Sequence, residues 1–207
     1  MPKRNSKSLL RKLIYVSGKT LPVIAVPSTA GTGAEITVAA VIKNERGIKD
    51  STVVIGLNVT HVVLDSELTV GAPENITVYC GIDALSHGLE GCLADVKSSE
   101  EDLQKSRECV KLVFENLPRL ISTPDDINAR QKMGLAAYYG GNAINKQLVG
   151  YIHAFAHSIG ALYHVPHGKA IGLCLLPIVS FHKDICKDKL AKLAIYCGFA
   201  EETDDKD

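Results

Sequence analysis

The pattern of apolar and polar positions changes about a third of the way along this 207-residue chain. In the first part, short apolar runs alternate with turn signals, which is typical of strands. The runs 22–27 (PVIAVP) and 61–65 (HVVLD) each predict a short buried strand. Residues 36–42 and 49–55 flank the turn sequence 44–47 (NERG), so they predict a β-hairpin.

From residue 73 onward the spacing of apolar residues becomes helical. We expect helices at roughly 76–93, 98–117, 123–139, 145–163 and 184–196. Ser98 with Glu101 three residues later resembles a capping box, and Thr123 before a proline is a second helix-start signal. Gly140-Gly141 predicts a break or close helix packing, and the nearly all-apolar stretch 168–182 should be buried.

The composition indicates a globular protein with a real core, since 46% of residues are hydrophobic and 22% are charged. The formal net charge is zero, which argues against a broad basic surface for nucleic acid. No apolar stretch is long enough to span a bilayer, and the first twenty residues lack a signal-peptide core. We therefore expect a cytoplasmic protein with no membrane partner. The six cysteines show no CxxC spacing, so we expect free thiols.

Histidines are concentrated in two stretches, GIDALSHGLEG (81–91) and GYIHAFAHSIGALYHVPHG (150–168). In the first, Asp83 and His87 lie four residues apart, which places them one turn apart on the same helix face. A single pair of this kind is weak evidence, because the helix repeat produces such pairs by chance and most lone histidines are surface or packing residues.

The second stretch makes a metal site the better interpretation. His153 and His157 repeat the four-residue spacing, and His167 follows after a loop. Three imidazoles and one carboxylate suit a divalent transition metal such as Fe²⁺ or Zn²⁺. Spacing alone does not say which of His153 and His157 binds the metal.

A glycine-containing turn, PSTAGTGAE (27–35), directly follows the first predicted strand. Small residues let the backbone approach a ligand closely, and the hydroxyl and backbone N–H groups can hold phosphate oxygens. The segment is neither a Walker loop nor a GxGxxG loop. By itself it is equally compatible with a tight turn that binds nothing.

Taken together, these segments resemble the iron-containing (group III) alcohol dehydrogenase family. PSTAGTGAEIT (27–37) resembles the family's PTTAGTGSEVT, and GIDALSHGLE (81–90) resembles GMDALTHAIE. IHAFAHSIGALYHVPHG (152–168) resembles VHALAHxLGxxYxxPHG. The segment 62–77 resembles the family's link between domains, and the resemblance extends from about residue 21 to about residue 198.

The resemblance implies an α/β plus all-α fold of the dehydroquinate synthase-like architecture. Residues 1–72 would form part of a dinucleotide-binding α/β domain, and 73–207 a helical metal-binding domain. The implied metal ligands are Asp83, His87, His153 and His167. His157 would face the nicotinamide and the substrate as a catalytic residue. Contacts to NAD or NADP are implied for Ser28, Thr29, Thr37, Lys49, Leu68 and Gly71.

Family members carry a complete nucleotide fold with a glycine-rich loop before the PTTAGTGSE turn, whereas only about twenty residues precede it here. We therefore expect this chain to be a central, C-terminally truncated portion of such an enzyme. The implied function is metal-dependent hydride transfer between a primary alcohol or diol, or the corresponding aldehyde, and NAD or NADP. Homo-oligomer formation is compatible with this interpretation.

Two alternatives remain open. The first is a metal-binding fragment without catalytic activity. The second is a metal-dependent hydrolase in which the Asp/His set activates water. The PSTAGTG turn after a strand is the feature that favours the dehydrogenase over the hydrolase.

Overall fold

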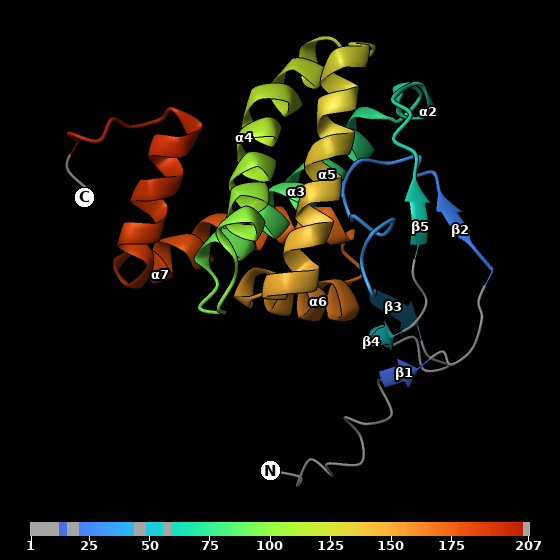
Figure 1. Cartoon of the computed structure of the whole chain (residues 1–207), viewed down its shortest axis with the longest axis horizontal. Coiled ribbons are helices and arrows are strands. Elements are labelled where there is room, and N and C mark those ends of the chain that lie inside the picture. Colours follow the sequence, from blue (N-terminus) through green and yellow to red (C-terminus); the bar gives the residue numbers. More distant parts are fainter. Residues whose placement is uncertain (1–12, 16–20, 44–48, 56–58, 205–207) are drawn as a thin grey trace, which may run out of the picture.

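The computed structural model describes residues 13–15, 21–43, 49–55 and 59–204, with two small sheets beside a body of helices (Figure 1). In the first sheet, of order β1-β4-β3, β4 pairs in parallel with β1 and antiparallel with β3. The second sheet is the parallel pair of β2 and β5. The strands are β1 Leu13–Tyr15, β2 Val23–Ala25, β3 Ala39–Lys43, β4 Lys49–Ile55 and β5 Val59–Val62.

The predicted hairpin is confirmed by the pairing of β3 with β4, in which Lys43 lies opposite Lys49. Its turn, 44–47, lies outside the described residues. Strands also form at the runs 22–27 and 61–65, but the expectation that they are buried was wrong. Ile24 is 63% exposed and Val63 is 47% exposed. A sheet of two short strands has two open edges and cannot bury both of its faces.

The helical character of the remainder is confirmed. Its helices are α2 Glu67–Val70, α3 Glu74–Leu93, α4 Glu100–Ser122, α5 Ile127–Gln147, α6 Tyr151–Tyr163 and α7 His167–Cys197. Helices α3, α4 and α5 pack against one another, and α7 packs against α3 and α6. The core between them contains Val110, Leu120, Met133 and Ile171, each 2% exposed or less.

Two helix starts differ from the predicted ones. The N-cap of α4 is Ser99 rather than Ser98, and its hydroxyl accepts a hydrogen bond from the Asp102 N–H at 3.1 Å. Because α4 continues to residue 122, Thr123 is its C-cap, and Asp126 caps α5 instead.

Helix α7 differs most from expectation. It runs unbroken through Pro177, where the sequence predicted a buried stretch followed by a separate helix. Leu176 is 69% exposed and Phe181 is 80% exposed, whereas Ala170, Ile171 and Cys174 are buried, so the prediction that 168–182 is buried holds for only one face of the helix. The C-terminal part of α7 extends beyond the helical body, on the side opposite the strands (Figure 1). Within the described residues, no helix is both long and apolar enough to cross a lipid bilayer.

The turn at 28–35 is fixed against the helices by close backbone contacts. Gly33 has a φ of 61°, and a Cβ added to it would lie 2.5 Å from the Gly141 Cα atom on α5. A Cβ added to Gly31 would lie 2.7 Å from the Cys80 Cα atom on α3. A Cβ added to Gly140 would lie 3.1 Å from the His87 Cβ atom on α3, which confirms the prediction of close helix packing for Gly140-Gly141. All six cysteines are free, as expected.

Candidate metal centre

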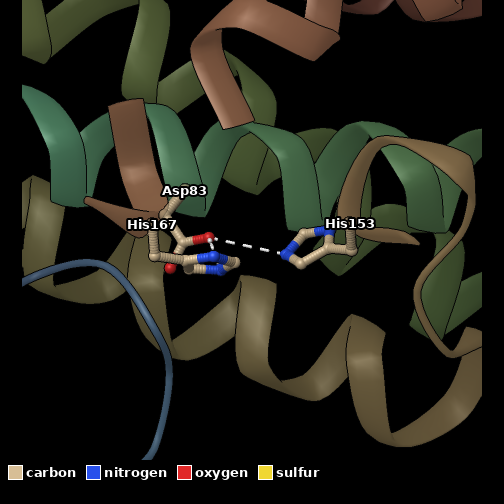
Figure 2. A group of neighbouring side chains, drawn as sticks. All are labelled: Asp83, His153 and His167. Atoms are coloured by element: carbon tan, nitrogen blue, oxygen red, sulfur yellow. Dashed lines mark ion pairs between the residues drawn. The ribbon is translucent and has the colours of Figure 1, made fainter. Parts of the chain in front are cut away.

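Asp83 lies where three helices meet, and its side chain is almost completely buried. Its Oδ1 atom is 3.6 Å from Nε2 of His87, 3.5 Å from Nε2 of His153 and 3.4 Å from Nε2 of His167. Asp83 and His87 come from α3, whereas His153 belongs to α6 and His167 begins α7. Figure 2 shows the side chains of Asp83, His153 and His167 directed toward one another. The stretches 81–91 and 150–168 thus converge, as the sequence predicted.

Local packing explains why His167 reaches α3. Gly168 follows it in the first turn of α7, and a Cβ added there would overlap the Tyr79 carbonyl of α3. Only glycine permits this close approach of the two backbones. Tyr79 lies one turn before Asp83, so the contact holds the start of α7 next to the carboxylate.

Several polar atoms of this cluster lack hydrogen bonds. Within the described residues, Asp83 Oδ1, His87 Nδ1 and His153 Nε2 are buried without a hydrogen-bond partner. Such atoms are rare in folded proteins and require an explanation. One donor atom each from Asp83, His153 and His167 can be chosen so that all three lie within 4.8 Å of one another. Carboxylate oxygen and imidazole nitrogen are ligands of iron and zinc, so these residues fit the implied metal.

His87 has a different position from the other two imidazoles. Its ring stacks on that of His153, with centroids 4.6 Å apart and planes 14° apart. It lies outside the three-residue group just defined, although its Nε2 faces the same Asp83 oxygen. The role of His87 as a fourth ligand therefore stays a prediction.

The electrostatics of the cluster centre on the carboxylate of Asp83. Burial alone would raise the pKa of Asp83, but the three nearby imidazoles outweigh it and hold the pKa well below its usual range. Burial is the main effect on His87 and lowers its pKa to about 4. Burial also opposes the charged form of His153, yet the carboxylates of Asp83 and Glu90 raise its pKa to about 9. At neutral pH the cluster therefore presents an ionised carboxylate, a neutral His87 and a protonated His153, which must release its Nε2 proton before that atom can bind a metal.

His157 lies beside the cluster. Its ring centroid is 5.1 Å from that of His167 and 6.0 Å from that of His153. The side chain is half-buried, and it lies outside the group of donor atoms. Its catalytic role stays a prediction.

The residues implied in cofactor binding lie in different surroundings. Thr37 lines a cleft of about 530 Å³ together with Glu35, Thr60 and Tyr138. Thr29 lines much smaller spaces beside α5. Ser28 is exposed, and Leu68 is 51% exposed. Gly71 is the C-cap of α2. Lys49 begins β4, and its side chain lies outside the described part of the chain.

Sequence reasoning gave no role to Glu90, which is 7% exposed and contacts the cluster. Its Oε2 atom is 2.6 Å from His153 Nδ1, and its Oε1 atom accepts a hydrogen bond from the Ile152 N–H at 2.7 Å. Positions 83, 87 and 90 follow the i, i+4, i+7 pattern of one helix face, and this spacing was the available signal.

The family model described as "Fe-containing alcohol dehydrogenase family, C-terminal" matches residues 77–207, and the model "Iron-containing alcohol dehydrogenase" matches residues 5–66. The chain is 36% identical over 179 residues to the 1-propanol dehydrogenase of Salmonella typhimurium, covering 85% of this chain and 48% of that protein. It is 32% identical over 184 residues to the NAD-dependent methanol dehydrogenase of Bacillus methanolicus, covering 88% of this chain and 48% of that protein.

The fold is similar to the crystal structure of a 1,3-propanediol oxidoreductase, with a TM-score of 0.87 and 27% identity. That match covers 94% of this chain and 51% of the other. The chain thus spans about half the length of the curated relatives it matches. Two family models that together match most of the sequence show that the chain belongs to the iron-containing alcohol dehydrogenase family.

Proposed function

We propose that this chain carries the metal site of an alcohol dehydrogenase that transfers hydride between a primary alcohol or diol and NAD or NADP. The observation that carries the proposal is the convergence of three imidazole Nε2 atoms on one carboxylate oxygen, at 3.4 to 3.6 Å. The named relatives act on 1-propanol and methanol, and a similar structure is a 1,3-propanediol oxidoreductase. Each of these substrates has a primary hydroxyl.

We assign Asp83, His87, His153 and His167 as metal ligands. When bound, Fe²⁺ or Zn²⁺ supplies Lewis acidity that lowers the pKa of an alcohol hydroxyl. With the metal bound, the ligating imidazoles would be neutral and Asp83 would contribute one negative charge, so the site would keep a net positive charge. Burial excludes competing water from the ligand side of this site.

We assign His157 to proton transfer. Its ring lies next to that of His167, and its side chain is only half-buried, so it connects the cluster with solvent. Imidazole is the side chain that most often serves as a general acid or base in proteins, which suits a group that accepts a proton and passes it to water.

Cofactor binding is assigned to Ser28, Thr29, Thr37, Lys49, Leu68 and Gly71. NAD or NADP, when bound, accepts the hydride. The turn that carries Ser28 and Thr29 touches α3 at Cys80, one helical turn before Asp83. This contact supports placing a nicotinamide bound at the turn close to the metal ligands.

The proposal is tested with the full 207-residue chain. Metal content is measured by elemental analysis, and oxidation of 1-propanol is followed by the absorbance of reduced NAD or NADP. We expect turnover that a chelator abolishes and that added Fe²⁺ or Zn²⁺ restores. His157→Ala should retain its metal but lose turnover. Ser28→Ala and Thr29→Ala should weaken NAD binding in calorimetry while metal stays bound. Stoichiometric metal without any turnover would refute the proposal for this chain and favour the non-catalytic alternative.

A further inference from the structure

Glu90 is a buried carboxylate to which the proposed chemistry gives no task. It lies on α3, the helix that carries Asp83 and His87. Both of its oxygens are engaged: Oε2 with Nδ1 of His153 at 2.6 Å, and Oε1 with the Ile152 N–H at 2.7 Å. A buried carboxylate is tolerated only when it is paired in this way. Because both oxygens face α6, Glu90 lies outside the group of donor atoms around Asp83.

The first contact determines which nitrogen of His153 carries the hydrogen. A carboxylate only accepts hydrogen bonds, so Nδ1 must donate to Glu90. In the neutral ring, the lone pair is then on Nε2. That atom faces Asp83 Oδ1 at 3.5 Å and makes no hydrogen bond within the described residues. In the neutral ring that binds a metal, the lone pair therefore lies where the ligand set converges.

The second contact determines where α6 begins. Gly150 is the N-cap of α6 and has no side chain with which to cap the helix. The carboxylate of Glu90 replaces that cap from another helix, by accepting the Ile152 N–H and placing negative charge at the positive end of α6. A Cβ added to Gly150 would lie 3.0 Å from Glu90 Oε1, so a side chain at this position would crowd the carboxylate.

We propose that Glu90 is a positioning residue for His153, selecting its Nδ1–H tautomer and anchoring the start of α6, so that metal affinity depends on a carboxylate that is not a ligand. The inference rests on the proposed metal site. Partners of this kind behind a metal-bound histidine commonly change metal affinity by about 10- to 100-fold.

Glu90→Gln tests the proposal with little change in shape. If the amide oxygen keeps the Ile152 N–H, the amide NH₂ faces Nδ1 and the hydrogen of His153 must move to Nε2. If the amide is turned the other way, its NH₂ opposes the Ile152 N–H. We expect zinc affinity, measured by competition with a chromophoric chelator, to fall about 10- to 100-fold. Glu101→Gln, which removes an exposed carboxylate in the first turn of α4, is the matched control and should leave zinc affinity unchanged.

A double-mutant cycle separates positioning from a general loss of structure. In a His153→Ala background, Glu90→Gln should have little further effect on zinc affinity, because the residue through which it acts is gone. An undiminished effect in that background would overturn the proposal. The tautomer of His153 can also be measured directly, by long-range ¹H–¹⁵N NMR of the zinc-loaded wild type. The spectrum should show hydrogen on Nδ1, and hydrogen on Nε2 would overturn the proposal.

The outcomes also distinguish this inference from the proposed function. A wild-type chain that binds neither Zn²⁺ nor Fe²⁺ would overturn both. Wild-type binding together with equally tight binding by Glu90→Gln would overturn the role of Glu90 alone.

Discussion

The strand-bearing segment 21–65 and the helical segment 74–197 contain similar apolar residues but bury them to very different extents. Val110 and Leu120 in the helices are each 2% exposed, whereas Ile24 and Val41 in the strands are 63% and 51% exposed. Asp83, His87 and His153 share this protection and His167 is half-buried, whereas Ser28 and Thr29 are exposed. The proposed metal site would therefore depend on core packing, and the proposed cofactor site would depend on how one turn contacts α3 and α5.

The largest predicted difference between the two segments is in the free energy of unfolding. Leu120→Ala removes a fully buried side chain and should lower the free energy of unfolding by about 3–4 kcal/mol. Ile24→Ala alters an exposed side chain and should change it by less than about 0.5 kcal/mol. Chemical denaturation followed by circular dichroism measures both. Equal losses from the two variants would mean that β2 is packed as firmly as the helices.

Ligand removal should have the next largest effect. Structural zinc sites with four ligands bind with about 10–16 kcal/mol, so losing one ligand should cost about 3 kcal/mol, or roughly 100-fold in affinity. We expect this loss for His153→Ala and for His167→Ala, measured by chelator competition. His157→Ala is the internal control and should bind metal normally. Full metal retention in either of the first two variants would contradict the ligand assignment.

Substitutions of glycine on α5 test the contact between this helix and the turn at 28–35. A Cβ at Gly141 would meet Ile36 Cγ2 at 2.6 Å, so Gly141→Ala should push the turn off the helix and cost about 2 kcal/mol. Gly134 on the same helix has open space at its Cβ position, so Gly134→Ala should stabilise the protein by about 0.5–1 kcal/mol. Thermal unfolding measures both effects. A calorimetric NAD titration should show weaker binding only for Gly141→Ala.

The smallest predicted effect concerns the start of α4. Ser99→Ala removes the hydroxyl that caps the helix and should lower stability by about 1 kcal/mol. Ser98→Ala, at the position that the sequence favoured as the cap, should change stability by less than about 0.5 kcal/mol. If denaturation curves showed the reverse order, Ser98 would be the cap in solution.

These cases show which features could be predicted from the sequence. Helix periodicity predicted the helical segment, and the histidine spacing predicted that the stretches 81–91 and 150–168 converge, because both are local regularities of the chain. The choice of His153 over His157 came from the family resemblance and not from the spacing. The burial of β2 and of one face of α7 was mispredicted, because an apolar run does not reveal what will cover it. Glu90 was missed because an acidic residue in a helix usually faces water, and only the position of α6 shows its partner.

The origin of the cluster in three helices has a consequence for folding. Asp83, His153 and His167 lie far apart in the sequence, so an unfolded chain cannot hold a cation with all three at once. A cation that recognises only the assembled helices shifts the folding equilibrium by mass action, by about 2.7 kcal/mol at a concentration one hundred times its dissociation constant. Metal supply would thereby influence how long each molecule survives in the folded state, independently of any reaction it catalyses.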